Sequence, residues 1–257
     1  MKLEKREFPI LEFDPDEKAI FNPQNLIKPI DIPEKCVICF FKEVLDHLYN
    51  EGKIKLFKKI KSEAGPIFLF EFEYIGERLI AFHPMIGAPM ASLLLEKVIA
   101  FGVKKFIAVG GAGVLANNIS MGQIVVPTTA VRDEGTSYHY LPPGREVEAS
   151  PIGIKAIEKT LNLHNINYIL GKTWTTDAIY RETPEKIKLR KKEGCITVEM
   201  EAAAFFAVAK FRNVVFSQII YGGDDLSLET WDHRGWNKQW SLREKLFWVA
   251  AESCINL

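Results

Sequence analysis

The sequence predicts an α/β protein in which a largely parallel sheet is covered by helices on both sides. Short runs rich in β-branched and aromatic residues alternate along the chain with segments of helical length. Alternation of this kind is typical of parallel sheets whose strands are joined by helices. The strand-like runs are also apolar on both faces, for example at 103–109 and 214–221, as expected for strands buried between two helical layers.

The composition of the 257-residue chain is that of an ordinary globular protein. Its 33 basic residues balance 33 acidic residues, which removes the strongest argument for non-specific binding to nucleic acid. No uninterrupted apolar run reaches the ~18 residues that a membrane span needs, and the charged N-terminus contains no apolar signal core. We therefore expect a cytoplasmic protein that binds neither nucleic acid nor membranes.

No low-complexity linker or internal repeat divides the chain. Residues 1–35 contain three Pro-containing segments and little periodicity, which predicts an irregular N-terminal arm that packs on the body or on a neighbouring subunit. Residues 36–257 are expected to form a single domain.

After the arm, apolar runs predict the strands and helical spacing predicts the helices. Gly76 indicates a hairpin, Pro89 and Pro184 suit first turns of helices, and Gly102 suits a helix end. Strands are predicted at residues 36–41, 54–60, 67–74, 78–83, 103–109, 124–126, 129–132, 168–174, 196–198 and 214–221. Helices are predicted at residues 42–49, 90–101, 152–163, 184–193, 242–255 and from the acids at 199–201 to about 212.

The most informative stretch is residues 194–227, GCITVEMEAAAFFAVAKFRNVVFSQIIYGGDDLS. It places Glu199 and Glu201 before an apolar helix, and Asp224 and Asp225 after an apolar strand. Burial of an ionised carboxylate costs several kcal/mol unless the group is hydrogen-bonded or paired. As a set, these acids indicate a ligand site. Taken singly, Glu199 or Glu201 could instead cap the start of the helix.

Two further strand ends carry distinctive residues, and ligands of parallel sheets bind beyond the carboxyl ends of strands. Gly110, Gly111 and Gly113 directly follow a strand, which suits either close approach of an anion to the backbone or a tight turn without a ligand. Residues 175–183 combine hydroxyls, an acid, an aromatic ring and a cation. This mixture suits either a flat ligand pocket or an ordinary polar loop.

The sequence predicts no dedicated metal site. Asp224 and Asp225 suit either Mg²⁺ binding or proton donation to a leaving group. No HExxH, GxSxG or comparable spacing is present. Cys36 and Cys39 have CxxC spacing, but they lie within an apolar run and have no second ligand pair. We interpret them as buried strand residues.

Four segments together resemble the nucleoside phosphorylase-I family. This family contains purine nucleoside phosphorylases, uridine phosphorylases and methylthioadenosine or adenosylhomocysteine nucleosidases. The segments are GVKKFIAVGGAG at residues 102–113, TDAIY at 176–180, VEMEAA at 198–203 and GDD at 223–225. Their order and spacing also agree with the family over roughly residues 36–256, and VEMEA is the most specific part.

The resemblance implies a three-layer α/β/α fold whose central mixed, mostly parallel sheet curls into a partial barrel. It implies homo-oligomers, either dimers or trimers of dimers. It also implies cleavage of the N-glycosidic bond of a nucleoside, by phosphate or by water, without a cofactor.

The resemblance further implies roles for individual residues. Glu201 would hold the ribose 2′- and 3′-hydroxyls, Met200 would lie beneath the sugar, and Asp224 would protonate or hydrogen-bond N7 of a purine. Ile179 would stack on the base. The other implied ligand contacts are Gly110, Gly111, Glu199 and Tyr180. These roles fit the reaction, because the sugar becomes cationic while the leaving base becomes anionic unless it is protonated.

The sequence departs from the phosphorolytic pattern at the phosphate site. Ala108 and Gly111 stand where those relatives carry Arg and Ser or Thr. The early Gly-Asp-Pro motif and its Arg are also replaced, by CFFKE at residues 39–43. The resemblance therefore leaves the phosphate site without its usual cations.

Three other cations are candidate substitutes, because a phosphate dianion needs cations and amide donors. They are Lys42, Arg132 and Arg181. If they do not converge on the site, water becomes the expected nucleophile and Glu43 a candidate base.

We rank a nucleoside phosphorylase first, a water-using nucleosidase second and a non-catalytic nucleoside-binding protein third. A purine is favoured over a pyrimidine, because Asp224 suits a purine and the Gln-x-Arg reader of uridine-type relatives is absent after Tyr180.

Overall fold

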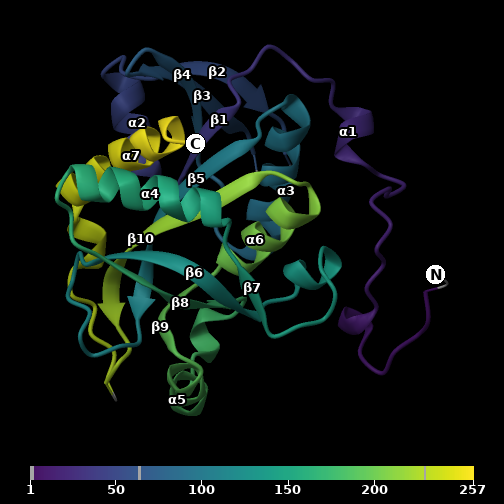
Figure 1. Cartoon of the computed structure of the whole chain (residues 1–257), viewed down its shortest axis with the longest axis vertical. Coiled ribbons are helices and arrows are strands. Elements are labelled where there is room, and N and C mark those ends of the chain that lie inside the picture. Colours follow the sequence, from purple (N-terminus) through teal and green to yellow (C-terminus); the bar gives the residue numbers. More distant parts are fainter. Residues whose placement is uncertain (1–2, 63–64, 229) are drawn as a thin grey trace.

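The structure, a computed structural model, describes residues 3–62, 65–228 and 230–257. A sheet forms the middle of three layers (Figure 1), with α3 and α6 on one face and α2, α4 and α7 on the other. The strands are β1 Lys35–Cys39, β2 Lys55–Ile60, β3 Ile67–Tyr74, β4 Glu77–Phe82, β5 Lys105–Val114, β6 Ile124–Asp133, β7 Glu146–Glu148, β8 Tyr168–Thr176, β9 Cys195–Glu199 and β10 Val215–Asp225. The main helices are α2 Lys42–Asn50, α3 Ala88–Phe101, α4 Pro151–Leu163, α5 Pro184–Lys192, α6 Ala202–Phe211 and α7 Trp240–Ile255.

The sheet confirms the predicted fold class. Its strand order is β10-β6-β8-β9-β5-β1-β4-β3-β2, and an additional β10–β5 pairing closes β10, β6, β8, β9 and β5 into a ring. The two longest ladders, β10–β5 and β6–β8, are parallel, whereas β5–β9 and β3–β4 are antiparallel. Ala112, Val114, Val125 and Ile220 pack together from three strands of this ring. The result is a mixed sheet that curls into a partial barrel.

The predicted elements are all present, with shifted boundaries. The two short strands expected at 124–126 and 129–132 are one strand, β6, interrupted by an irregularity between Pro127 and Thr129. A proline has no N–H for a ladder, which explains why the sequence suggested a break there. The hairpin expected at Gly76 is the antiparallel β3–β4 pair.

The Gly-rich stretch is not a turn, because β5 continues through Gly110 and Gly111 to Val114. Aromatic rings from neighbouring segments explain in part why positions 110 and 111 are glycines. A Cβ on Gly110 would lie 3.2 Å from Phe40 Cδ2, and one on Gly111 would lie 3.3 Å from Tyr221 Cε1. The interpretation as a tight turn is therefore wrong. The glycines allow two aromatic rings to pack against a continuous strand.

One edge of β5 changes partner in the middle of the strand. Residues 105–109 pair with β1, whereas Gly113 and Val114 pair with β9. Among the described strands, none pairs with residues 110–112 on this edge. We call residues 110–112 the β5 switch segment. A divergence of two neighbouring strands is the place where α/β sheets accept ligands.

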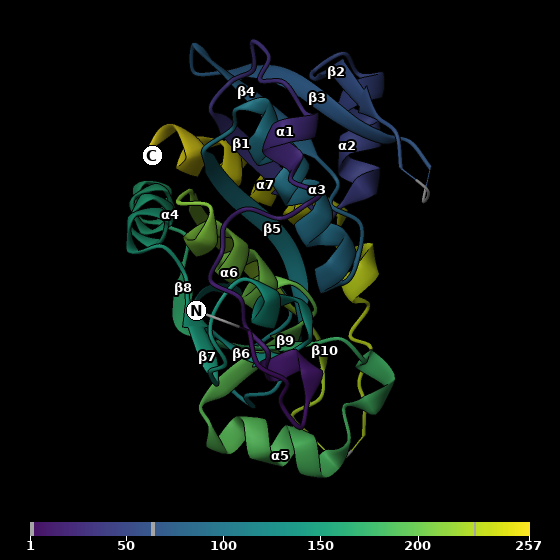
Figure 2. The ribbon, with the colours of Figure 1, turned by 90° about the vertical axis from the view of Figure 1, so that its right-hand side faces the viewer.

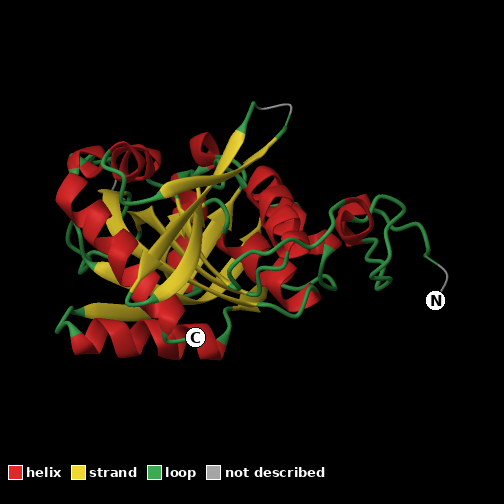
Figure 3. Cartoon of the chain, turned by 90° about the horizontal axis from the view of Figure 1, so that it is seen from above, coloured by secondary structure: helices red, strands yellow, loops and turns green. Residues whose placement is uncertain are grey.

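The N-terminal residues lie along the outside of the body. They contain two short helices, η1 Pro9–Leu11 and α1 Pro23–Leu26, the latter capped by the Asn22 side chain. Figure 3 shows this segment extending away from the strands. It is tied to α3 by a hydrogen bond from Ile30 N to Phe101 O (3.1 Å). None of the helices in the described ranges is long and apolar enough to cross a membrane.

The cysteines confirm their interpretation as core residues. All four are unoxidised and buried. Burial raises the pKa of Cys39 to about 12, so its thiol stays protonated at neutral pH.

Candidate active site

Glu201 is buried at the N-terminus of α6, where the chain leaves β9. Its Oε1 accepts a hydrogen bond from Gly87 N (2.6 Å). Gly87 follows β4 and adopts a φ of 94°, a conformation that favours glycine. The strand β4 is next to β1 in the sheet. The hydrogen bond between Glu201, which follows β9, and Gly87, which follows β4, therefore spans the β5 switch segment, where β1 and β9 diverge.

Glu199 holds the start of α6. Its Oε2 accepts hydrogen bonds from Glu201 N (2.7 Å) and Ala202 N (2.6 Å), and its Oε1 accepts one from Thr175 Oγ1 (2.6 Å). The Thr175 hydroxyl in turn accepts a hydrogen bond from Ala203 N (2.9 Å). The helix-cap interpretation, which the sequence left open, therefore describes Glu199. Its carboxylate positions Glu201 and has its hydrogen-bonding capacity occupied within the chain.

The surroundings of Glu201 are acidic. Burial raises the pKa of Glu201 to about 8, and the Glu199 carboxylate adds to the increase. Burial also raises the pKa of Glu199 to about 7, although Thr175 and two backbone amides oppose it. Glu134, at the end of β6, is buried as well, and one of its oxygens has no hydrogen-bond partner in the described structure. Such a site favours ligand groups that donate hydrogen bonds, such as sugar hydroxyls.

Glu201→Gln is expected to stabilise the folded protein at alkaline pH. A carboxyl whose pKa is raised by folding binds more protons in the folded than in the unfolded state, so stability falls as pH rises from ~4.3 to about 8. Glutamine does not ionise, so the stability of the variant does not fall in this way as the pH rises. At pH 8.5 its melting temperature should exceed that of the wild type by roughly 5–10 °C, and the difference should vanish near pH 4.5. Thermal unfolding across this range checks it, and a pH-independent difference would contradict it.

Asp225 has a structural role. Its Oδ2 forms an ion pair with Arg234, and its Oδ1 accepts a hydrogen bond from Ser227 N (2.7 Å). Asp225 is therefore held by partners within the chain. No group of three or more side chains suited to a metal ion is found within the described residues.

Asp224 is half-buried, and its carboxylate faces the junction of β5 and β9. Its Oδ1 lies 3.8 Å from the position of a Cβ on Gly113, and Val198 Cγ1 lies 2.9 Å from the same position. Val198 is three residues before Glu201 and pairs with Gly113. Asp224 therefore reaches the end of β9 from which Glu201 extends.

The segment expected to contact a base lies on the surface of the single chain. Ile179 and Tyr180 belong to a short 3-10 helix, η3 Ile179–Arg181, and are 52% and 95% exposed. Met200 is half-buried between the two glutamates. Glu182, which the sequence analysis missed, follows η3. Burial, with a smaller contribution from the Asp224 carboxylate, raises the pKa of Glu182 to about 7.

Arg132, a candidate phosphate ligand, is used within the chain. Its guanidinium donates hydrogen bonds to Ser137 Oγ (2.8 Å), Pro142 O (2.8 Å) and Leu141 O (3.3 Å). It also stacks on Tyr138. These bonds direct Arg132 into the loop after β6.

The other two candidate cations are exposed. Lys42 forms an ion pair with Asp46 at the start of α2. It is close enough to His83 to add to the effect of burial, which lowers the pKa of His83. Lys42 begins α2 shortly after the end of β1, where Cys39 pairs with Val109, so it lies on the β1 side of the β5 switch segment. Arg181 lies at the end of η3. No interaction in the described structure joins Lys42, Arg132 and Arg181.

Glu43, the candidate base for a water nucleophile, forms an ion pair with Arg243. Arg243 is buried, lies over the rings of Phe41 and Trp236, and donates two hydrogen bonds to Tyr221 Oη (3.1 and 3.0 Å). This ion pair engages the Glu43 carboxylate within the chain.

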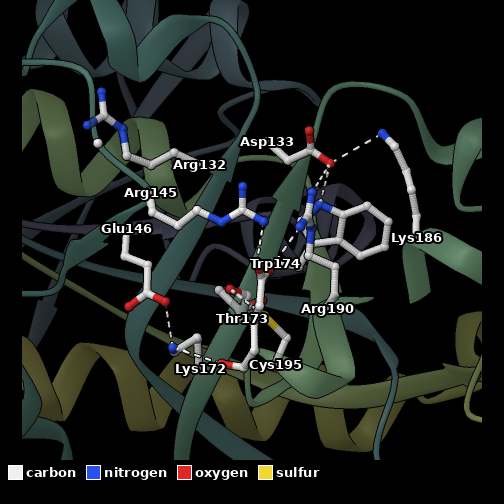
Figure 4. Close-up of polar contacts among 12 residues, drawn as sticks. Arg132, Asp133, Arg145, Glu146, Lys172, Thr173, Trp174, Lys186, Arg190 and Cys195 are labelled. Atoms are coloured by element: carbon white, nitrogen blue, oxygen red, sulfur yellow. Dashed lines mark hydrogen bonds and ion pairs between the residues drawn. The ribbon is translucent and has the colours of Figure 1, made fainter. Parts of the chain in front are cut away.

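A polar cluster holds α5, which follows the base-contacting segment. Figure 4 shows Trp174, Arg190 and Lys186 around Asp133, whose Oδ2 they approach at 3.0, 3.0 and 3.3 Å. Burial alone would raise the pKa of Asp133, but the two cations hold it below its ordinary value. Most side chains of α5 are polar, so this cluster supplies much of its attachment. Figure 2 shows α5 at the opposite end of the molecule from β2 and β3.

Asp133→Ala is expected to lower the free energy of unfolding by about 2–3 kcal/mol, because it removes one of the two carboxylate partners of the buried Arg190 and the hydrogen-bond acceptor of Trp174 Nε1. Asp46→Ala is the matched control. It removes an exposed ion pair with Lys42 and should change stability by less than ~0.5 kcal/mol. Denaturant unfolding checks both, and equal effects of the two variants would refute the anchoring role.

The geometry defines an α/β protein with a buried glutamate and a partly buried aspartate around the β5 switch segment. The family described as the phosphorylase superfamily matches residues 34–245. The chain belongs to this family.

Individual relatives point in the same direction. A region of 126 residues is 31% identical to a purine nucleoside phosphorylase, DeoD-type 1, of Shewanella oneidensis, and covers 48% of this chain and 53% of that relative. The chain thus spans about half the length of this curated relative.

Solved structures confirm the fold. A purine nucleoside phosphorylase of Toxoplasma gondii in complex with immucillin-H superposes with a TM-score of 0.77 at 21% identity, covering 88% of this chain and 92% of that one. A uridine phosphorylase of Vibrio fischeri superposes with a TM-score of 0.74 at 21% identity, covering 90% and 95%.

Proposed function

We propose that this protein is a nucleoside phosphorylase, which transfers the pentose of a nucleoside from its base to inorganic phosphate, and that purine nucleosides are preferred. The placement of Glu201 carries the proposal. Its buried carboxylate extends from β9 toward the loop after β4, beside the one stretch of β5 that changes partner.

In the proposed reaction Glu201 accepts hydrogen bonds from the ribose 2′- and 3′-hydroxyls. As the glycosidic bond breaks, the sugar gains positive charge, which a carboxylate stabilises more strongly than it stabilises the neutral ground state. Met200 lies beneath the sugar. The backbone of Gly110 and Gly111 contacts the ligand along the unpaired edge of the switch segment.

Asp224 acts at the other end of the ligand. It supplies a proton or a hydrogen bond to N7 of the leaving purine, so that the base does not depart as an anion. The oxygen that contacts N7 is Oδ1, which faces Gly113 at the β5–β9 junction. Ile179 and Tyr180 contact the base from η3, on which they are exposed. Glu199 supports the site indirectly by fixing the start of α6.

Phosphate is proposed as the nucleophile, with Lys42 as the cation contributed by this chain. Lys42 begins α2 shortly after the end of β1, on the β1 side of the β5 switch segment. Hydrolysis is not favoured, because Glu43 is held by Arg243.

We also propose that the protein is a homo-oligomer, because several large apolar side chains near the site are exposed in the single chain. They are Ile86, Ile179, Tyr180, Leu228 and Trp231.

The experiment is incubation of the purified protein with inosine, guanosine, adenosine and uridine, each with and without phosphate. The proposal expects ribose 1-phosphate and free base from a purine nucleoside, and only when phosphate is present. Base release that does not depend on phosphate would favour hydrolysis. The absence of product from every nucleoside would refute the proposal.

A further inference from the structure

The chain after β10 folds back so that Trp231 lies beside Asp224. Asp225 N donates to Asp232 O (2.8 Å) and Asp232 N donates to Asp225 O (3.0 Å), which closes the loop. Arg234 reinforces the closure by pairing with Asp225 and donating to Ile119 O (3.0 Å). In this antiparallel bridge Asp224 and Trp231 are diagonal neighbours on one face, a separation that a side chain as large as tryptophan can span.

The Trp231 side chain is held by a hydrogen bond from its indole N–H, while much of its ring is exposed to solvent. Its Nε1 donates a hydrogen bond of 2.7 Å to Asp224 Oδ2. The His233 ring meets it edge to face, with centroids 5.4 Å apart. The residue is nevertheless 61% exposed. A large apolar ring that is held in place yet exposed is suited to contact with another flat ring.

This hydrogen bond gives the two oxygens of the Asp224 carboxylate different surroundings. Oδ2 is occupied by the indole N–H, whereas Oδ1 faces the β5–β9 junction near Gly113. A free carboxylate on a half-buried side chain could rotate between orientations. The indole N–H favours the orientation that presents Oδ1 to the ligand.

We propose that Trp231 belongs to the ligand site, with its indole ring forming one wall of the base subsite and its N–H orienting the Asp224 carboxylate. The ligand class is a flat heteroaromatic base with a ring nitrogen that can receive a hydrogen bond. The inference rests on the proposed function, because it assumes that Asp224 faces the base. It adds a residue from the loop after β10 to a site otherwise built from β5, β9, the start of α6, η3 and the end of β10.

Two variants separate the two roles. Trp231→Phe keeps a ring but removes the N–H, and Trp231→Leu removes both. Since stacking on an aromatic side chain contributes about 1–3 kcal/mol per base, the Leu variant should raise KM for a purine nucleoside by about 10-fold or more. The Phe variant should raise KM by less than ~3-fold and lower kcat by about 5–10-fold, since one orienting hydrogen bond is lost.

Trp240→Leu is the matched control, because Trp240 is also exposed but its ring packs on His47 of α2. Its KM and kcat should equal those of the wild type. A purely structural Trp231 would instead give lower thermal stability with unchanged KM in both variants, and that result would overturn the inference.

Nucleoside binding measured without turnover keeps this inference separate from the proposed reaction. Inosine, guanosine or uridine, added without phosphate, should quench tryptophan fluorescence in the wild type and in Trp240→Leu, but not in Trp231→Phe. Quenching that depends on Trp231, without ribose 1-phosphate formation, would support the contact and refute the reaction. Cleavage with equal KM in wild type and Trp231→Leu would refute the contact and leave the reaction standing. If the wild type shows neither quenching nor cleavage, both fail.

Discussion

Glu201→Gln is expected to lower kcat/KM for nucleoside cleavage by about 10²–10³-fold, the loss typical of removing one preorganised electrostatic group from an active site. Glutamine nearly matches glutamate in shape and can still accept a hydrogen bond from Gly87 N. What it lacks is the negative charge that stabilises the cationic sugar. Most of the loss should therefore appear in kcat, because charge develops only as the bond breaks.

Steady-state kinetics with a purine nucleoside at saturating phosphate measures this effect, at a pH above 8, where the Glu201 carboxyl is ionised. Glu148→Gln is the matched control, since Glu148 is an exposed carboxylate on β7, and it should retain wild-type activity. If Glu201→Gln cleaved nucleosides within ~3-fold of the wild-type rate, Glu201 would have no part in stabilising the sugar.

Asp224→Asn is the second large effect, with kcat for inosine or guanosine expected to fall by about 10²–10⁴-fold. This range is typical for loss of a general acid. Asparagine can still accept the hydrogen bond from Trp231 Nε1, so the loop should keep its structure. The variant cannot transfer a proton to the departing base, which then has to leave as an anion.

A substrate that needs no proton tests the assigned role. The base of 7-methylguanosine leaves as a neutral molecule, because its ring already carries a positive charge. With this substrate the deficit of Asp224→Asn should shrink to about 10-fold or less. An equal deficit with guanosine and 7-methylguanosine would show that Asp224 only maintains structure.

The sequence predicted most of the fold because its apolar runs are long and its boundaries are well marked. Every strand of the closed ring contains an apolar run, and Pro89, Pro184 and Gly102 lie at the helix ends where they were expected. The closure of the ring could not be predicted from the runs alone. It depends on the pairing of β10 with both β5 and β6, which no local pattern specifies.

The roles of Glu199 and Glu201 could not be distinguished from the local sequence. Their positions two residues apart at a helix start fit a cap and a ligand contact equally well. The structure distinguishes them through partners distant in sequence. Thr175 and the first amides of α6 occupy Glu199, whereas Glu201 meets Gly87.

The charged residues were the hardest to assign, because a charge finds its partner through the fold. Arg132 bonds to a loop that follows it, and Glu43 pairs with Arg243, 200 residues further along the chain. Trp231 was missed altogether. Its relation to Asp224 follows from the closure of the loop between Asp225 and Asp232, and an isolated tryptophan in a polar segment gives no signal of this.

The most direct test is a crystal structure with a purine nucleoside and phosphate bound to the Asp224→Asn variant. We predict one ligand at the β5 switch segment, with its ribose hydroxyls within hydrogen-bonding distance of Glu201 and its purine N7 facing residue 224. A nucleoside bound elsewhere, or bound so that these two side chains contact no common ligand, would contradict the assignment of both residues.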